Sequence, residues 1–130
     1  MTQPKICLLV DDDPDDQEVF LTALSDVSSS ALCLIAPDGD RALELLYNEE
    51  TVPDYIFLDL NMPRMDGFEF LAAMKKSNVL KDIPIIVYST TSQPAQIEKV
   101  KKLGATDFFT KTYSYKDLCT LLRKYFGDVK

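Results

Sequence analysis

The sequence contains no histidine, and its three cysteines are widely spaced. Without histidine, the chain cannot form a histidine-based catalytic triad, bind a metal through imidazole or carry a phosphohistidine of its own. Cys7, Cys33 and Cys119 are odd in number, and each lies in an apolar segment. This pattern indicates buried thiols and not a disulfide framework or a zinc site.

Long hydrophobic runs and an excess of positive charge are also missing. The apolar runs are at most about five residues long, far below the roughly 20 that span a membrane. The segment Met1–Lys5 lacks the apolar centre of a signal peptide. A net charge of -7 argues against binding to a nucleic-acid backbone. We therefore expect a cytoplasmic protein with neither a membrane nor a nucleic acid as its partner.

The 130 residues are 46% hydrophobic, which is typical of one folded domain with one core. Short apolar runs alternate with amphipathic stretches along the whole chain, which predicts alternating strands and helices. The predicted strands are Ile6–Val10, Leu32–Ile35, Tyr55–Leu58, Ile85–Tyr88 and Asp107–Phe109. The predicted helices begin near Pro14, near Asp38 or Asp40, at Asp66, after Pro94 and at about Ser114. Gly104 is placed to end the fourth helix.

Repeated βα units of this kind predict a parallel sheet with helices on both faces. A closed eight-stranded barrel needs nearly twice this length. We therefore predict an α/β fold with an open, doubly wound, five-stranded parallel sheet of flavodoxin-like order 2-1-3-4-5. We expect residues 1–130 to be a single domain with its core over residues 5–126 and no output domain.

Polar side chains follow four of the predicted strands. Asp11 and Asp12 follow the first and Asp59 the third, Ser89 and Thr90 follow the fourth, and Lys111 comes after the fifth. Ligands of open α/β sheets bind outside the carboxyl ends of the strands, where these groups would meet. Carboxylates suit a hard divalent cation, and a hydroxyl with an ammonium suits phosphate oxygens. This combination predicts Mg²⁺-dependent phosphoryl chemistry.

Four motifs together resemble the receiver domain of bacterial two-component response regulators, single-domain chemotaxis regulators included. They are Leu8–Asp13, Leu58–Pro63 with Met65–Gly67, Pro84–Thr90, and Leu103–Ala105 before Lys111. The resemblance extends from Lys5 to about Phe126, and it is the order of the motifs on these strand ends that makes it specific.

The resemblance implies a role for each matching residue. Asp59 is the phosphoacceptor, and Asp11, Asp12 and the backbone carbonyl of Asn61 join it around Mg²⁺, with Asp12 the more direct ligand. Ser89 and Lys111 bind the phosphoryl group, and Phe108 is the aromatic switch residue. Possible tuning positions at the rim are Arg64, Thr90 and Thr91. The implied donor is a sensor histidine kinase or a histidine phosphotransfer protein, and a downstream protein target reads a surface on the fourth helix, fifth strand and fifth helix.

One position departs from the pattern of the family. Receivers usually have proline directly after the lysine, often with a cis peptide, whereas Thr112 follows Lys111 in this chain. A cis peptide before a residue other than proline costs ~2.5–4 kcal/mol. The sequence leaves open whether this bond is trans with a shifted loop or cis at that cost.

The residues fit a signalling receiver better than they fit three other functions. A pseudo-receiver that only docks partners would not need the intact acidic pair, Asp59, Ser89 and Lys111. A phosphatase of the haloacid-dehalogenase type needs an Asp-x-Asp motif, and Asn61 stands where the second aspartate belongs. A flavin-binding flavodoxin needs a phosphate-cradling loop after the first strand, where this chain has aspartates. Whether a receiver of this kind is a terminal output or a phosphorelay shuttle is left open by the sequence.

Several of these residues also have simple structural interpretations. Asp15 and Asp16 are typical of a solvated helix N-terminus, and Asp66 of a helix cap. Ser89 and Thr90 in isolation would be a capping pair, Lys111 a surface lysine and Phe108 a core residue. It is the combination of motifs that favours the functional interpretation.

Overall fold

The computed structural model describes residues 4–48, 52–60, 62, 65–90, 93–111 and 114–127. Its strands are β1 (Ile6–Val10), β2 (Leu32–Ala36), β3 (Tyr55–Leu58), β4 (Ile85–Ser89) and β5 (Asp107–Thr110). Its helices are α1 (Pro14–Val27), α2 (Gly39–Asn48), α3 (Gly67–Lys76), α4 (Pro94–Lys102) and α5 (Tyr115–Phe126). The predicted alternation of strands and helices is confirmed.

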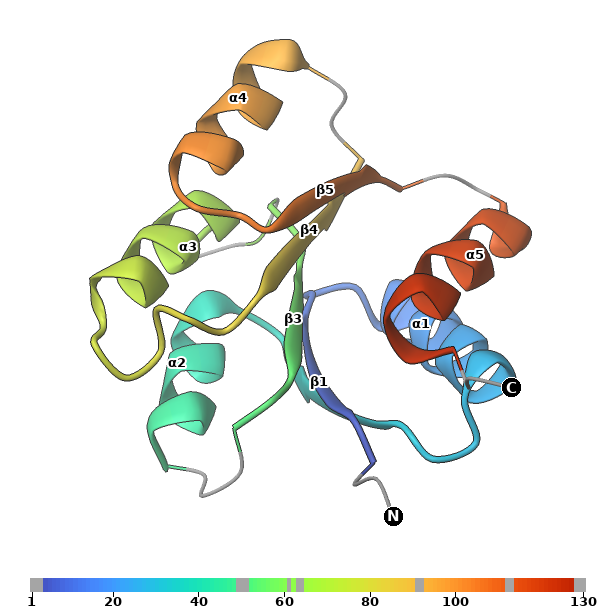
Figure 1. Ribbon diagram of the computed structural model, residues 1–130. Coiled ribbons are helices and arrows are strands. Elements are labelled where there is room, and N and C mark those ends of the chain that lie inside the picture. The colour runs from blue at the N-terminus through green and yellow to red at the C-terminus, as the bar shows by residue number, and fades with distance from the viewer. Residues whose placement is uncertain are drawn as a thin grey trace.

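All strands pair in parallel in the order β2-β1-β3-β4-β5, as predicted (Figure 1). Three of them end one residue later than predicted, at Ala36, Ser89 and Thr110. The reason is the pairing between strands: Val10 lies opposite Ala36, and Ser89 lies opposite Thr110. The ladder therefore carries Ser89 inside β4, one residue beyond the last apolar side chain of that strand.

The helices begin where the capping residues predict. Asp13 and Asp66 accept backbone N–H groups of α1 and α3, and Asp66 forms a capping box with Glu69. Ser114 caps α5 through the Asp117 N–H, and Asp38 accepts the Arg41 N–H at the start of α2. Each cap satisfies backbone donors that have no partner inside the helix.

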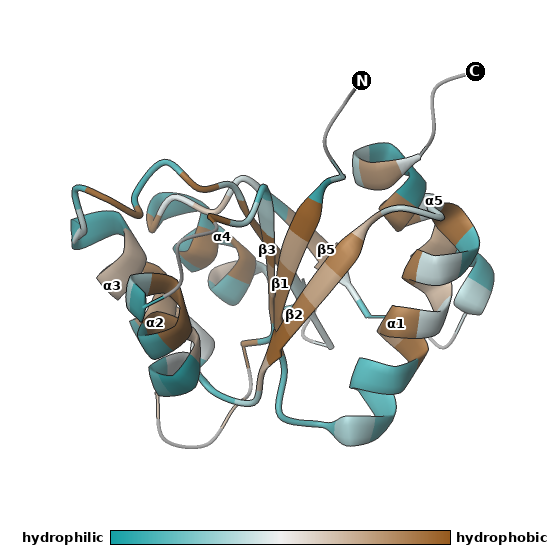
Figure 2. Ribbon diagram, turned by 90° about the horizontal axis from the view of Figure 1, so that it is seen from below, coloured by the Kyte–Doolittle hydropathy of each residue, from teal (hydrophilic) through white to brown (hydrophobic). Residues whose placement is uncertain are grey.

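The sheet is covered on both faces, with α2, α3 and α4 on one side and α1 and α5 on the other (Figure 1). Figure 2 shows apolar strands between the two helical layers. One core, between the sheet and α2–α4, includes Leu8, Leu58 and Phe70. The other, between the sheet and α1/α5, includes Phe20, Phe57 and Leu122. These two cores hold the carboxyl ends of the strands in a rigid row.

The helix faces differ from the prediction in detail. The helical spacing of apolar residues predicts an inward face for each helix, but six residues on these predicted faces are only half-buried: Val27, Leu45, Phe68, Ala72, Ile97 and Leu103. The pattern missed Phe70, Met74 and Leu121, which are buried. Cys7 and Cys119 are buried free thiols, as expected, but the free thiol of Cys33 is half-buried because β2 is an edge strand. No helix of the described residues is long and apolar enough to cross a membrane.

Candidate functional site at the carboxyl ends of the strands

The sheet brings Asp11 and Asp59 together at its carboxyl edge. Asp11 follows β1, and its backbone N–H donates to the Ala36 carbonyl at 3.1 Å. Asp59 follows β3, and its N–H donates to the Val10 carbonyl at 2.9 Å. Both residues are buried, with 2% and 8% of their surfaces exposed. The strand ladder therefore holds two acidic residues side by side in a place where an uncompensated charge is costly.

Asp12 completes a group of three carboxylates. Oxygen atoms of Asp11, Asp12 and Asp59 all lie within 4.8 Å of one another. Asp12 is exposed to solvent, whereas the other two are buried. A set made of oxygen donors, open on one side, fits a hard divalent cation such as Mg²⁺ or Mn²⁺. The site therefore passes the chemical test for a metal centre of this class.

The surroundings of Asp11 act on its ionisation. Burial raises the pKa of Asp11 above its ordinary value of 3.8. The Asp13 N–H, which donates to Asp11 Oδ1 at 3.0 Å, and the charge of Lys111 offset part of that rise. The net direction is upward because desolvation is the largest effect. A nearby cation relieves this cost, which is a second reason why the site suits a metal.

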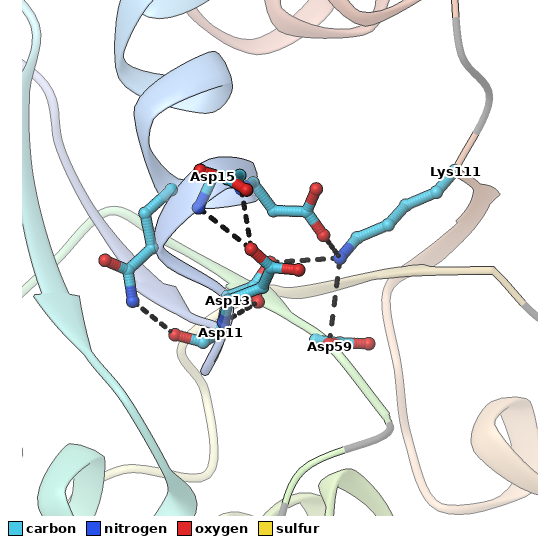
Figure 3. Close-up of polar contacts among 7 residues, drawn as sticks. Asp11, Asp13, Asp15, Asp59 and Lys111 are labelled. Carbon is cyan, nitrogen blue, oxygen red and sulfur yellow. Dashed lines mark hydrogen bonds and ion pairs between the residues drawn. The ribbon is translucent and has the colours of Figure 1, made fainter.

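Lys111 supplies positive charge to this cluster. Its Nζ lies 3.0 Å from Asp11 Oδ2, 2.9 Å from Asp16 Oδ2 and 3.7 Å from Asp59 Oδ2. Figure 3 shows the Lys111 side chain extending toward Asp11 and Asp59. The backbone N–H of Lys111 also donates to the Ser89 carbonyl at 2.6 Å. The loop after β5 is thereby tied to the end of β4.

The ionisation of Lys111 reflects these contacts. Burial by itself lowers the pKa of Lys111. The hydrogen bond to Asp16, the charges of Asp59 and Asp11, and the hydrogen bond to Asp11 raise it, and the net pKa is above 10.5. Lys111 is therefore a fixed positive charge over the physiological pH range.

Ser89 is fully buried, and among the described residues its Oγ has no hydrogen-bond partner. A buried hydroxyl without a partner costs free energy, because its hydration is lost and not replaced. This atom lies at the end of β4, beside the strand that Asp59 follows, and it is suited to bond a polar ligand.

The orphan hydroxyl leads to a prediction about stability. Replacing Ser89 with alanine should raise the free energy of unfolding by about 1 kcal/mol, because it removes a buried hydroxyl that has no partner in the part of the chain that the structure describes. Ser28 is the matched control: it is buried too, but its Oγ accepts the Ala31 N–H at 3.1 Å. Ser28→Ala should lower the free energy of unfolding by about 1 kcal/mol. Urea titration measures the free energy of unfolding of both variants. A loss of stability in Ser89→Ala would contradict the prediction.

The remaining candidate residues lie at the rim or outside the described part of the chain. Phe108 is half-buried and packs against the core beneath α2–α4, and Thr90 is exposed. Asn61, Arg64 and Thr91 lie outside the described residues, and so does Thr112, the second residue of the peptide in question. The structure therefore brings together Asp11, Asp12, Asp59 and Lys111, with Ser89 tied to Lys111 through the backbone.

Two neighbours of Lys111 were not assigned to the site from the sequence. The sequence predicts a solvated Asp16 in the first turn of α1, yet its carboxylate is an ion-pair partner of Lys111. The Lys111 ammonium also lies 5.5 Å from the centre of the Tyr88 ring. The rule that residues following parallel strands meet at one edge of the sheet covers neither contact, because Asp16 lies on a helix and Tyr88 lies within a strand.

A cleft of about 490 Å³ opens beside Lys111, between α1 and the start of α5. Its walls include Asp16, Tyr88, Thr90 and Tyr115 as well as Lys111 itself. Neither Asp59 nor Ser89 lines this cleft. The cleft therefore gives access to Lys111 and is distinct from the carboxylate site.

Comparison with known proteins agrees with this geometry. The family model described as "Response regulator receiver domain" matches residues 7–123. A relative is response regulator Rcp1 of Synechocystis, 31% identical over 92% of this chain and 85% of Rcp1. Another is the Helicobacter pylori sensor histidine kinase CheAY, 31% identical over 92% of this chain. The chain spans 15% of CheAY and 51% of the rice response regulator ORR1.

Solved structures are also similar. That of the phosphorylated cyanobacterial phytochrome response regulator RcpA superimposes with a TM-score of 0.86 at 29% identity, over 95% of this chain and 94% of that one. The Mn²⁺-bound form of Rcp1 gives 0.82 at 30% identity, over 93% and 91%.

Proposed function

The chain belongs to the family of response regulator receiver domains, and on that premise we propose that Asp59 accepts a phosphoryl group. The observation that supports this most is the grouping at the carboxyl edge of the sheet. A buried Asp59 lies with the Asp11 and Asp12 carboxylates within 4.8 Å and the Lys111 ammonium at 3.7 Å. These residues supply a nucleophile, a set of metal ligands and a cation, all close enough to act on one transferred phosphoryl group.

In the proposed reaction, a carboxylate oxygen of Asp59 attacks the phosphorus of a phosphohistidine on a partner protein. An O–P bond forms, the P–N bond breaks, and its electron pair stays on the imidazole of the donor. When bound, Mg²⁺ supplies charge neutralisation between the carboxylates and the phosphoryl oxygens. Asp11 and Asp12, with the backbone carbonyl of Asn61, are the residues proposed to hold it.

Lys111 and Ser89 would act on the transferred group. Lys111 offers a permanent positive charge to its oxygens, and the hydroxyl of Ser89 offers a hydrogen bond that it makes to no described residue of the protein. The chemistry is therefore positioning and charge stabilisation around Asp59. The protein acts catalytically only on itself, in its own phosphorylation and dephosphorylation.

The same contacts are proposed to make a conformational switch. A phosphoryl group bonded by Ser89 and Lys111 favours the state in which these contacts exist, and an equilibrium shifts only by such differential binding. Phe108 is the residue proposed to rearrange with Ser89. The surface that would change is α4, β5 and α5, where a downstream protein would bind. The partners are proposed to be a histidine kinase or phosphotransfer protein upstream and a protein target downstream.

Intact mass spectrometry after incubation with Mg²⁺ and acetyl phosphate tests the proposal. We expect one phosphoryl adduct on the native protein, no adduct on Asp59→Ala, and suppression of the adduct by a metal chelator. Asp54→Ala is a suitable control, because Asp54 is an exposed carboxylate at the opposite end of β3, where it accepts the Ile6 N–H. Its adduct should equal that of the native protein.

An adduct that persists in Asp59→Ala would place the phosphoryl group elsewhere and contradict the proposal. Absence of an adduct, together with absence of Mg²⁺ binding in a calorimetric titration, would favour a docking module that is not phosphorylated.

A further inference from the structure

Asp16 contacts Lys111 more closely than Asp59 does. Its Oδ2 lies 2.9 Å from Lys111 Nζ, against 3.7 Å for Asp59 Oδ2. Asp16 comes from the first turn of α1 and does not belong to the group of carboxylates that can hold a metal. The lysine expected to serve the phosphoryl group is thus held by a residue with no other part in the site.

The position of Asp16 in a helix does not explain this contact. An acidic residue in a first helical turn is favoured by the helix dipole. Asp15 in the same turn satisfies that preference equally well, yet it is exposed and forms no ion pair among the described residues. The preference of a helix N-terminus for acidic residues therefore does not account for the contact of Asp16 with Lys111.

We propose that Asp16 is a positioning residue that holds the Lys111 ammonium on the α1 side of the site, in competition with the group carried by Asp59. Asp16 thereby slows phosphoryl transfer to Asp59. This inference rests on the proposed function, because it concerns the rate of that reaction.

The geometry of the ammonium explains the competition. A lysine ammonium has three N–H donors. Two are directed to Asp11 and Asp16 at hydrogen-bond distance, and Asp59 at 3.7 Å is reached by charge alone. A phosphoryl group on Asp59 carries about two negative charges and attracts the ammonium away from α1. The attraction of Asp16, which holds Lys111 near α1, must therefore be overcome when the phosphoryl group is transferred to Asp59.

Asp16 is the partner that can release the lysine. The Asp16 side chain is 46% exposed and lines the cleft beside Lys111, whereas that of Asp11 is 2% exposed. A carboxylate left at the cleft becomes hydrated, but one left in the interior does not. Lys111 can therefore leave Asp16 without leaving a buried charge unpaired. Asp16 also adds negative charge where a negatively charged phosphodonor approaches.

The rate of phosphorylation by acetyl phosphate at fixed Mg²⁺, followed by intact mass, tests this inference. Asp16→Asn should be phosphorylated about fivefold faster than the native protein at low salt, and the difference should shrink as salt rises. Asp16→Glu keeps the charge and should restore a rate close to that of the native protein. The matched control Asp15→Asn alters the same helical turn without touching Lys111, and its rate should equal that of the native protein. An Asp16→Asn rate equal to or below that of the native protein would overturn the inference.

A second measurement needs neither metal nor phosphorylation. Competitive acylation of lysines in the metal-free protein, read by peptide mass spectrometry, reports how much neutral amine each lysine offers. Asp16→Asn should raise the acylation of Lys111 about fivefold relative to Lys124, which is paired with Asp107 and serves as the internal reference. An unchanged ratio would show that Asp16 does not hold Lys111. If this ratio changes while the native protein takes no phosphoryl group, the contact is real and it is the proposed function that fails.

Discussion

Replacing Lys111 with methionine is expected to lower the free energy of unfolding of the metal-free protein by about 3 kcal/mol. The side chain of Lys111 is 10% exposed and lies within 4.0 Å of carboxylate oxygens of Asp11, Asp16 and Asp59. Methionine keeps the length of the side chain but removes the charge, which leaves buried carboxylates uncompensated. Urea unfolding in the presence of a chelator measures the loss.

The control for this substitution is Lys124→Met. Lys124 Nζ lies 2.9 Å from Asp107 Oδ2, but its side chain is 57% exposed. An exposed ion pair contributes at most about 1 kcal/mol, so this variant should lose much less stability than Lys111→Met.

The difference in stability between the native protein and Lys111→Met should also depend on pH. The pKa of Asp11 is raised above its ordinary value of 3.8, so below that pH Asp11 is protonated and has no charge for Lys111 to compensate, and the stabilities of the native protein and Lys111→Met should converge.

Magnesium gives a further check on the same variant. Because Lys111 and a divalent cation neutralise the same carboxylates, Mg²⁺ should stabilise Lys111→Met more than it stabilises the native protein. Equal stability of Lys111→Met and the native protein without metal would contradict the assignment of Lys111 as the charge that holds the acidic cluster together.

Replacing Gly67 with alanine is expected to lower the free energy of unfolding by about 2–3 kcal/mol and to slow phosphorylation of Asp59. An added Cβ at Gly67 would lie 2.6 Å from Leu60 Cα and 2.7 Å from the Asp59 carbonyl oxygen. Both are backbone atoms of the segment that leaves β3, so α3 or Asp59 must shift. Elsewhere in a helix the same substitution would stabilise by up to about 1 kcal/mol.

Gly39→Ala is the matched control, because Gly39 is the first residue of α2 as Gly67 is of α3. A Cβ there would meet the side chain of Met65 at 2.9 Å, and a methionine side chain can move aside. We expect a change of less than about 1 kcal/mol for Gly39→Ala and an unaltered rate of phosphorylation. Thermal or urea unfolding compares the stabilities of Gly67→Ala and Gly39→Ala, and the acetyl phosphate assay compares their rates of phosphorylation. Equal stabilities of the two variants would refute the close packing of α3 on the Asp59 segment.

Much of the fold could be predicted because its signals are local. Apolar runs such as Tyr55–Leu58 and helix caps such as Asp66 depend on residues a few positions apart, and the structure confirms both elements. The strand order followed from length and alternation, and it too is confirmed. The ends of β2, β4 and β5 were placed one residue short, because the last pair of a ladder depends on the neighbouring strand.

The grouping of Asp11, Asp12, Asp59 and Lys111 was also predictable, since a parallel sheet collects the residues that follow its strands at one edge. The contact of Asp16 with Lys111 was not predictable, and neither was the finding that the buried Ser89 hydroxyl has no partner among the described residues.

The sequence by itself thus determined the elements, their order and the chemistry at the strand ends, because each is encoded by neighbouring residues and by the geometry of parallel sheets. The tertiary structure decided which carboxylate holds Lys111, how closely α3 packs on the Asp59 segment, and that the hydroxyl of Ser89 is buried. These features depend on how closely segments as many as 95 positions apart pack against each other, and no local sequence pattern encodes that packing.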